Sequence, residues 1–437
     1  MNNIQVYSRN TLLHRLGLPT GTKSVIFFIS LMLITLPMAH VYNTLAVILF
    51  VLFTVLSYQR ASMKIHLTAA LWLPIILFVL MTASVAWSVD TVVSFKALSK
   101  EAPLLFIPLA FGIMRSLRYK HINDILRYYS SAMCLLAIYI TLRAVFRFFS
   151  GEGMHVFFLN GLATLSISLY LSVFLSLAMF YFLGKKNNTY WGKVAMYFLF
   201  FVIILLSKKI IIITDAVVVI VYYLFFSKDD RANRVYSILL FTILASALAY
   251  YGNVSEIMER ENERRTGAPA TEMVHNVTLQ EAWTKESFSP GDYLNGYAFR
   301  LYQLRTAKEM LSGSSRMLSG YGINASSVEV KKRGEARGLT YTGWADQPYN
   351  TLNFHNQYIE AFSDLGIGGC LLIIAMVVYS LYNAVRRRYF IHIAFSVLMI
   401  SLFLTESFLW RQKGLVFFTV FYCLFNTPGI FVKQNNV

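Results

Sequence analysis

The chain has 437 residues, of which 57% are hydrophobic and only 14% are charged, and its formal net charge is +17. Its mean hydropathy of +0.54 is too high for a soluble domain of this length. A soluble globular protein is therefore excluded, and we expect lipid to be the main solvent of the molecule.

Twelve hydrophobic segments reach or approach the length that a helix needs to cross about 30 Å of hydrocarbon. Each must be helical, because the backbone amides have no other hydrogen-bond partner in lipid. The sequence therefore predicts an all-α integral membrane protein with about twelve transmembrane helices. The predicted spans cover 24–39, 43–57, 67–87, 99–114, 124–142, 157–183, 190–206, 210–226, 234–251, 364–384, 390–408 and 414–431.

The basic residues between these segments predict the orientation. With a cytoplasmic N-terminus, about half of the 39 lysines and arginines fall in cytoplasmic segments and few in the short external loops. Both termini are then cytoplasmic, and one long polar loop is external. This topology divides the chain into residues 1–251 with nine spans, the loop 252–358, and residues 359–437 with three spans.

Several classes of function lack support in the sequence. The cytoplasmic cations are scattered over short turns, so we expect no nucleic-acid partner. Cys134, Cys370 and Cys423 share no metal-ligand spacing. The external side also has no Asp-x-Asp pair, no Walker loop, no His-Glu-x-x-His and no Gly-x-Ser-x-Gly. We therefore expect neither a metal nor another cofactor.

The long loop alternates predicted helices and turns. A helix is predicted over Tyr297–Ser312, with an apolar face formed by Tyr297, Leu301, Leu304 and Leu311 and with Arg300 at the edge of that face. A tight turn at Gly320 and Gly322 and a flexible basic stretch over Glu329–Gly338 follow. A short helix over Asn353–Leu365, ending at Gly366, leads into the tenth span.

His355 is the strongest candidate for a catalytic residue. Only His275 and His355 lie in the long loop, and Ile359 and Phe362 share the predicted helical face of His355, which should point toward the membrane helices. A neutral imidazole at a helix N-terminus suits a general base. The alternative is an interfacial histidine that hydrogen-bonds Asn356 or a backbone carbonyl.

The loop and one external turn also offer cations that could bind an anion. Lys208 and Lys209 lie between two spans on the outer face, where they either bind an anion or extend to lipid headgroups. Arg300 presents a rigid fork that matches phosphate oxygens, and Arg305 and Lys308 could assist it or be solvated helix charges.

Three motifs resemble the bacterial O-antigen ligases and the related polysaccharide polymerases, which act on undecaprenyl-diphosphate-linked glycans. Phe354–Glu360, followed by Asp364–Gly369, is similar to the family's His-Asn-x-x-Leu segment. Arg300-Leu301 with Gly320–Asn324 resembles its arginine-containing loop helix and Gly-x-Gly turn. Ser207-Lys208 stands where the family usually has Ser-Arg, so the bidentate fork is lost there.

The resemblance implies a twelve-span membrane glycosyltransferase fold in the bacterial inner membrane, with the periplasmic loop between spans nine and ten capping the active cavity. We expect Arg300 and Lys208, aided by Lys209 and Arg305, to hold the diphosphate, and His355, supported by Asn356, to accept the proton of an acceptor hydroxyl. This is inverting, metal-independent glycan transfer.

The acceptor stays open. A lipid A core sugar would make the protein an O-antigen ligase, a second glycan would make it a polymerase, and a protein hydroxyl would make it an oligosaccharyltransferase. We favour a ligase-like enzyme. A lipid-linked sugar flippase is the alternative of another class, and His355 discriminates because a flippase needs no proton acceptor in a cap loop.

Overall fold

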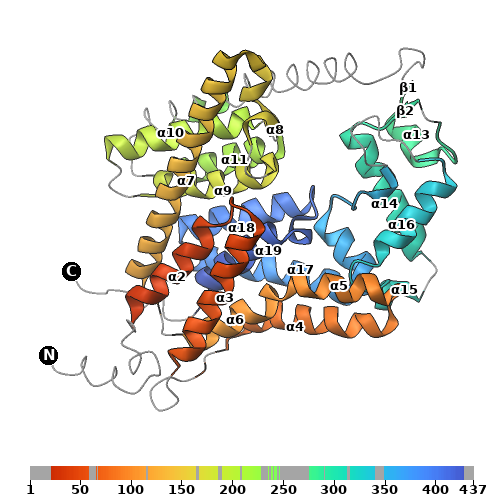
Figure 1. The fold of residues 1–437 in the computed structure, drawn as a ribbon, viewed down its shortest axis with the longest axis horizontal. Helices are drawn as coiled ribbons and strands as arrows, with labels where there is room; N and C mark the ends of the chain where they lie inside the picture. The colour runs from red at the N-terminus through yellow and green to blue at the C-terminus, as the bar shows by residue number, and fades with distance from the viewer. Residues whose placement is uncertain are drawn as a thin grey trace.

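The computed structural model describes residues 21–58, 65, 67–114, 117–163, 167–185, 189–206, 209–227, 235, 238–239, 241–243, 246, 275–289, 291–312, 315–339 and 349–427. They form two parts that lie side by side along the longest axis (Figure 1). We call the larger part, made of 21–246 and 357–427, the helical body. The smaller part, made of 275–356, is the cap.

The helical body contains the helices that hydropathy predicts. Each predicted span other than 234–251 contains a helix, and in 234–251, most of which lies outside the described residues, the few described residues are helical. The helices are α2 (Thr22–Ile34), α3 (His40–Leu56), α4 (Ala69–Ser84), α5 (Thr91–Glu101), α6 (Pro103–Ile113), α7 (Tyr119–Arg147), α8 (Leu159–Leu162), α9 (Ser168–Leu183), α10 (Tyr190–Leu205), α11 (Lys209–Phe225), α17 (Gln357–Arg386), α18 (Phe390–Phe403) and α19 (Gln412–Asn426). Short helical turns connect them at η2 (Val85–Trp87), η3 (Phe148–Glu152), η4 (Met154–Phe157) and η6 (Phe408–Trp410).

Two predicted spans are interrupted. The range 99–114 divides between α5 and α6 at Pro103, which lacks the N–H that a continuous helix would need. The range 157–183 divides between α8 and α9, and only Ser168–Leu183 forms a long helix. A hydropathy average does not register such breaks, because it smooths over single backbone positions such as Pro103.

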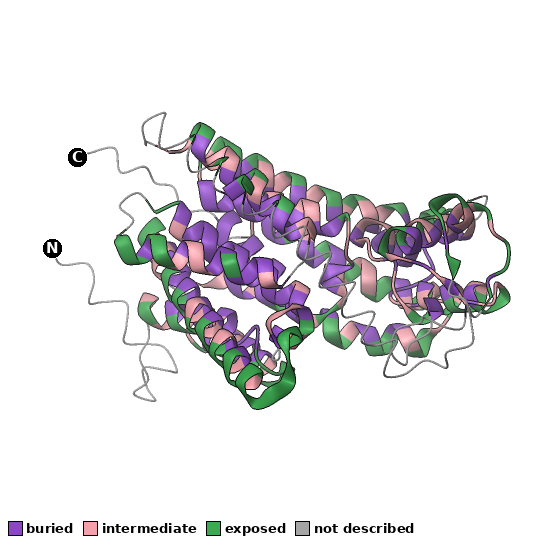
Figure 2. Ribbon diagram, turned by 90° about the horizontal axis from the view of Figure 1, so that it is seen from above, coloured by how far each residue is buried: buried purple, intermediate pink, exposed green. Residues whose placement is uncertain are grey.

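Burial separates the interior helices from the outer ones. Every residue of α19 from Lys413 to Asn426 is buried, as expected of a helix that is packed on all sides. Outer helices instead expose large apolar side chains such as Val41 and Phe146, which are both 74% exposed. Figure 2 shows the buried residues concentrated between the helices and the exposed ones on their outer sides.

Among the described residues, three helical segments are long and apolar enough to cross a membrane, judged by length and composition: Ala69–Trp87, Tyr119–Glu152 and Gln357–Arg386. The described chain is mostly helical, as predicted. Its architecture is compatible with an all-α membrane protein.

The cap is a small helical unit with its own apolar core. It contains β1 (His275–Asn276), α13 (Leu279–Thr284), β2 (Asp292–Tyr293), α14 (Gly296–Leu311), α15 (Arg316–Ser319), α16 (Ser326–Ala336) and η5 (Tyr349–Thr351). The two short strands pair in parallel, with His275 opposite Asp292. One buried cluster surrounds Phe299 and Tyr302, and a second surrounds Met310 and Phe354.

The predicted helix over Tyr297–Ser312 is confirmed as α14, but its predicted apolar face is wrong. Tyr297 is 69% exposed and Leu304 is 44% exposed. The buried stripe instead contains Ala298, Phe299, Tyr302, Gln303, Thr306, Ala307, Met310 and Leu311. Gln303 and Thr306 are polar residues whose side chains donate to backbone carbonyls, so their burial was not visible in the apolar pattern.

The predicted flexible stretch over Glu329–Gly338 is also wrong, because residues 326–336 form α16. Arg333 pairs with Glu329 one turn away at 2.8 Å, which supports a helix. Gly334 packs against Asn350, where a side chain would collide. The charges that suggested a solvated segment are thus helix-surface pairs.

A kink in α17 binds the cap to the helical body. Gly366 has a φ of 70°, a left-handed conformation that interrupts the helical hydrogen bonds. The carbonyls of Ser363 and Asp364, one turn earlier, accept instead from the backbone N–H groups of Tyr321 at 2.9 Å and Gly322 at 2.8 Å. The predicted glycine turn is therefore confirmed, and it docks the cap on α17.

The same turn contacts the ends of α4 and α5. The backbone N–H of Ile323 donates to the Ser84 hydroxyl at 3.0 Å, and the Ser94 hydroxyl donates to the Ile323 carbonyl at 2.7 Å. The Trp87 indole N–H donates to the Ser319 carbonyl at 2.7 Å. These bonds fix one edge of the cap against both α4 and α5.

Candidate active site

Three side chains that the sequence singles out meet at one short loop, residues 404–407 between α18 and η6. Asn356 donates to the carbonyl of Leu404, Arg300 donates to the carbonyl of Thr405, and the ring of His355 contacts the carboxylate of Glu406. The cap helix α14, the start of α17 and the end of α18 thus converge there.

His355 lies immediately before α17 and not within it, which corrects the predicted helix start. The helix begins at Gln357, and the φ of His355 is 49°, so its backbone turns away from the helical path. Its Nδ1 lies 3.1 Å from Oε2 of Glu406, and its side chain is 27% exposed. The edge-to-face contact with Phe299, at 5.7 Å between ring centroids, holds the imidazole from the cap side.

Asn356 is the N-cap of α17. Its Oδ1 accepts from the backbone N–H groups of Tyr358 and Ile359, both at 3.0 Å. Its Nδ2 donates to the Leu404 carbonyl at 3.0 Å. The side chain therefore fixes both the helix start beside His355 and the loop that carries Glu406.

Arg300 reaches from α14 to the helical body. Its guanidinium donates to the Thr405 carbonyl from Nε at 3.3 Å and from NH2 at 3.2 Å, and to the Gly296 carbonyl at 3.0 Å. Within the described part of the chain these are its hydrogen bonds, and none involves a carboxylate. An exposed guanidinium whose charge is not neutralised by an acid can bind an anion beside His355.

Arg305, which the sequence analysis placed with Arg300, lies elsewhere. Its Nε pairs with Oε1 of Glu309 at 2.9 Å, and its NH1 donates to the Lys285 carbonyl at 2.7 Å. Burial would raise the pKa of Glu309, but hydrogen bonds from Arg337 and Arg305 outweigh burial and lower that pKa. Arg305 thus belongs to an ion-pair network inside the cap, and we leave it out of the proposed diphosphate site.

Of the two predicted lysine ligands, Lys208 lies outside the described residues and Lys209 is the first residue of α11. Near the other end of α11, Tyr222 contacts Phe390, the first residue of α18. The C-terminal part of α11 therefore lies at the start of α18. The N-terminal end of α11, with Lys209, lies toward the other end of α18, where the 404–407 loop begins.

Glu406 is a candidate site residue that no sequence motif indicates, and it contacts the ring of His355. The predicted span 390–408 includes Glu406, whereas α18 ends at Phe403 and leaves Glu406 in the loop. Its neighbour Ser407 is buried and donates to Glu360 at 3.0 Å, and Glu360 also accepts from the backbone N–H of Phe354 at 3.2 Å. The available signal was an acidic residue near the end of the predicted span 390–408, on the side assigned to the long loop.

The second histidine of the cap has a different setting. Nδ1 of His275 lies 2.8 Å from the buried carboxylate of Asp292, which Lys285 also contacts at 2.6 Å. Burial would raise the pKa of Asp292, but hydrogen bonds from Lys285, the Ser289 N–H and His275 outweigh it and lower that pKa. His275 therefore ties β1 to β2 and offers a matched control for His355.

At the 404–407 loop the structure brings together the imidazole of His355, the carboxylate of Glu406 that contacts this ring, and the guanidinium of Arg300, which has no acidic partner among the described residues. Such a set can remove a proton from a hydroxyl and can stabilise a nearby anion. No protein-family model matches the sequence, and no curated protein matches it.

Proposed function

We propose that this protein is a membrane glycosyltransferase that moves a glycan from a polyprenyl diphosphate to an acceptor hydroxyl. The observation that carries the proposal is the convergence of the His355–Glu406 pair and Arg300 on residues 404–407. His355 suits the acceptor hydroxyl and Arg300 suits the diphosphate leaving group. A cap that only bound the lipid diphosphate would need Arg300 alone.

The contact with Glu406 suits His355 to act as a base. A carboxylate accepts hydrogen bonds, so it favours the tautomer with hydrogen on Nδ1 and leaves the lone pair on Nε2. Nε2 would take the hydroxyl proton while the acceptor oxygen attacks the anomeric carbon. Glu406 would then stabilise the imidazolium that forms, as a third group orients the base in other base-dependent reactions.

Arg300 would serve the leaving group. As the acceptor oxygen bonds to the anomeric carbon, the bond from that carbon to the diphosphate oxygen breaks and its electron pair stays with the diphosphate. The guanidinium therefore stabilises the diphosphate more in the transition state, where its negative charge is growing, than in the ground state. Lys208 and Lys209 would add charge at the same site, and a single displacement inverts the anomeric centre.

The proposal includes a location. About twelve transmembrane helices would place the protein in the bacterial inner membrane, with both termini in the cytoplasm and the cap in the periplasm. The charge bias of the sequence supports this orientation. The direction of α11 supports a common side for Lys209 and the 404–407 loop. The donor would arrive laterally within the bilayer, and neither a nucleotide, nor a metal, nor another cofactor would be required.

For the acceptor we favour a lipid A core sugar or another surface glycan, which makes the enzyme ligase-like in lipopolysaccharide biosynthesis. The test is to incubate purified full-length protein with a defined polyprenyl-diphosphate glycan and separate acceptors: lipid A core, a second glycan and a secreted protein. Free polyprenyl diphosphate and glycosylated product are measured together. Product on lipid A core supports the ligase, whereas product on one of the others identifies a polymerase or a protein transferase.

The same assay separates transfer from transport. A lipid-linked sugar transporter would move the donor across proteoliposomes without releasing polyprenyl diphosphate. Release of polyprenyl diphosphate that depends on an acceptor would establish transfer. Movement of the donor without release would overturn the proposal.

A further inference from the structure

A cavity of about 40 Å³ lies beside the candidate active site, between α4, α5 and the first turns of α17. Gln357 and Glu360 line it directly after His355 and Asn356 in the chain, and Leu409 and Trp410 line it shortly after Glu406. His355 and Arg300 do not line it. The cavity is therefore a neighbour of the candidate active site, built on the same two segments.

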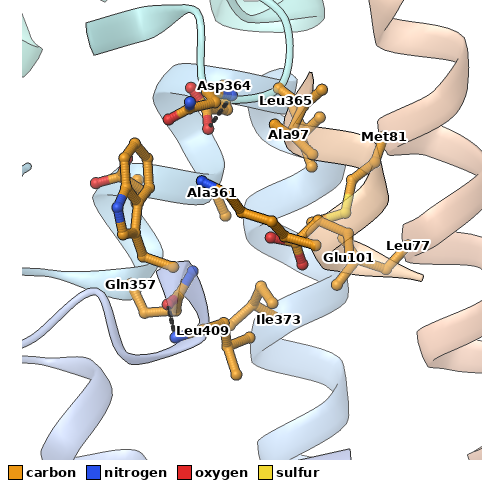
Figure 3. A pocket seen from close by; sticks show the side chains of 15 residues that line it. Leu77, Met81, Ala97, Glu101, Gln357, Ala361, Asp364, Leu365, Ile373 and Leu409 are labelled. Atoms are coloured by element: carbon orange, nitrogen blue, oxygen red, sulfur yellow. Dashed lines mark hydrogen bonds between the residues drawn. The ribbon is translucent and has the colours of Figure 1, made fainter. Parts of the chain in front are cut away.

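Glu101 is the central polar group of this cavity. It is the last residue of α5, only 9% exposed, and its carboxylate points into the space between α4 and α17 (Figure 3). Its Oε2 is buried and has no hydrogen-bond partner in the described part of the chain. A buried carboxyl oxygen without a partner is costly, so the site favours a group that can donate to it.

The two other carboxylates at the cavity already have partners. Glu360 accepts from Ser407 and the Phe354 N–H, and Asp364 accepts from the backbone N–H groups of Asn324 at 2.8 Å and Ser326 at 3.3 Å. These two acids hold the loop and the cap in place. Glu101 has no such role, and the described residues contain no group of three acids, histidines or cysteines that could hold a metal ion.

The remaining polar groups offer both donors and acceptors. Asn324 has a buried Oδ1 without a partner among the described residues. Gln357 accepts from the Leu409 N–H through Oε1, which leaves its amide nitrogen to donate, and the exposed Lys100 lines the same cavity. Acceptors and donors side by side match hydroxyl groups, which donate and accept at once. An anion would meet the Glu101 carboxyl, and a cation would meet Lys100.

The apolar part of the cavity lining suits the C–H groups of a sugar. Leu77, Met81, Ile323 and Ile373 form apolar walls, and the half-buried Trp410 adds an aromatic surface. A pyranose ring also has apolar C–H faces beside its polar hydroxyls. A volume of about 40 Å³ exceeds the roughly 10–15 Å³ that one water needs, so it fits a hydroxymethyl group or a pair of hydroxyls and not a whole ring.

We propose that this cavity is a sugar subsite in which Glu101, Asn324 and Gln357 bind the hydroxyl edge of one residue of a glycan and Trp410 contacts its C–H face. The inference rests on the proposed glycan transfer, since that reaction brings glycans to the adjoining loop. The glycan belongs either to the donor or to the acceptor, and the two share this chemistry. The subsite would set specificity without taking part in bond making.

The test measures KM and kcat for donor and acceptor glycan separately, in purified full-length wild type, Glu101→Gln, Glu101→Met and Trp410→Leu. Glu335→Gln, on an exposed face of α16, is the control. We expect Glu101→Met and Trp410→Leu to raise one KM by about 10- to 100-fold with kcat within about twofold, and Glu101→Gln to have a smaller effect. The substrate whose KM rises identifies the source of the glycan.

A series of monodeoxy analogues of that substrate provides the second measurement. Wild type should reject one analogue by about 10- to 100-fold, and Glu101→Met should lose this discrimination. Unchanged KM values in all variants, or a fall in kcat alone, would show that the cavity holds ordered water or serves packing, and would overturn the inference. If the Glu101 variants do not fold, uniform use of all analogues by wild type would overturn it.

Failure of the proposed function gives a different result. In that case wild type releases no polyprenyl diphosphate with any acceptor. Binding of the free glycan, followed by intrinsic tryptophan fluorescence, then decides the inference alone. Saturable binding that Trp410→Leu and Glu101→Met weaken supports a sugar subsite without transfer, and the absence of binding overturns it.

Discussion

Two faces of the cap helix α14 use arginine in opposite ways. Arg305 points into the cap, where Glu309 neutralises its charge at 2.9 Å. Arg300, little more than one turn earlier, points to the helical body and bonds only to carbonyls among the described residues. A basic residue is thus a candidate anion ligand when its charge has no acidic partner, and sequence spacing does not reveal whether it has one.

The largest expected effect separates the two histidines of the cap. His355→Ala removes the proposed proton acceptor, and we expect the rate of glycan transfer to fall by about 10²- to 10⁴-fold. His275→Ala, which removes a ring bonded to Asp292, should leave the rate near that of wild type. Release of polyprenyl diphosphate by purified protein measures both. Equal losses in the two variants would contradict a specific role for His355.

The two arginines of α14 give the next largest contrast. Arg300→Ala should lower the transfer rate by about 10²- to 10³-fold, because it removes charge where the leaving group develops its own. Arg305→Ala should instead lower the midpoint of thermal unfolding of the cap, because it leaves Glu309 with fewer partners. Steady-state kinetics and a thermal unfolding scan on the same preparations test the contrast. Similar kinetic losses in both variants would show that they share one role.

A third variant tests the residue of the helical body that contacts His355, Glu406. Glu406→Gln keeps the shape of the side chain but removes the charge that would stabilise a protonated imidazole. We expect a loss of about 10- to 100-fold in kcat, with the KM for the donor unchanged. Kinetics over a range of donor concentrations separates the two constants. A rise in KM without a fall in kcat would place Glu406 in donor binding instead.

The smallest expected effect is a loss of stability of the cap at acidic pH. Asp292 and Glu309 have pKa values lowered in the folded cap by hydrogen bonds from basic partners that outweigh burial. Their contribution to stability is thus present above the ordinary carboxyl range near pH 4 and is lost as the pH falls through the lowered values. The protection of amides in α13, α14 and α16 against hydrogen exchange, corrected for the pH dependence of intrinsic exchange, should therefore fall below about pH 4. Protection that is unchanged by acid would contradict this assignment.

Hydropathy and charge predicted the parts of the fold that depend on averages. The positions of the helices follow from long apolar runs, and the cap follows from the polar stretch between them. The averages could not locate the break at Pro103 or the kink at Gly366, since each depends on one backbone position. The buried face of α14 was also mispredicted, because Gln303 and Thr306 are buried through hydrogen bonds and not through hydrophobicity.

Motifs singled out part of the candidate site. His355, Asn356 and Arg300, which the motifs include, each contact residues 404–407. Glu406 lies far from His355 in the chain and becomes its neighbour only when α18 ends at Phe403. Glu101 was missed for a similar reason, since the cavity that it lines needs α4, α5 and α17 to pack together. Neither the contact of Glu406 with His355 nor the cavity around Glu101 leaves a local pattern in the sequence.

The most direct test of the central claim compares binding with turnover for the two residues that meet at the 404–407 loop. Binding of a fluorescent polyprenyl-diphosphate glycan and its transfer to acceptor are measured for wild type, His355→Ala and Arg300→Ala in the same proteoliposomes. We predict that His355→Ala binds the donor as wild type does but transfers almost none, whereas Arg300→Ala is weakened in both. Donor binding unaffected by Arg300→Ala together with wild-type transfer by His355→Ala would contradict the account.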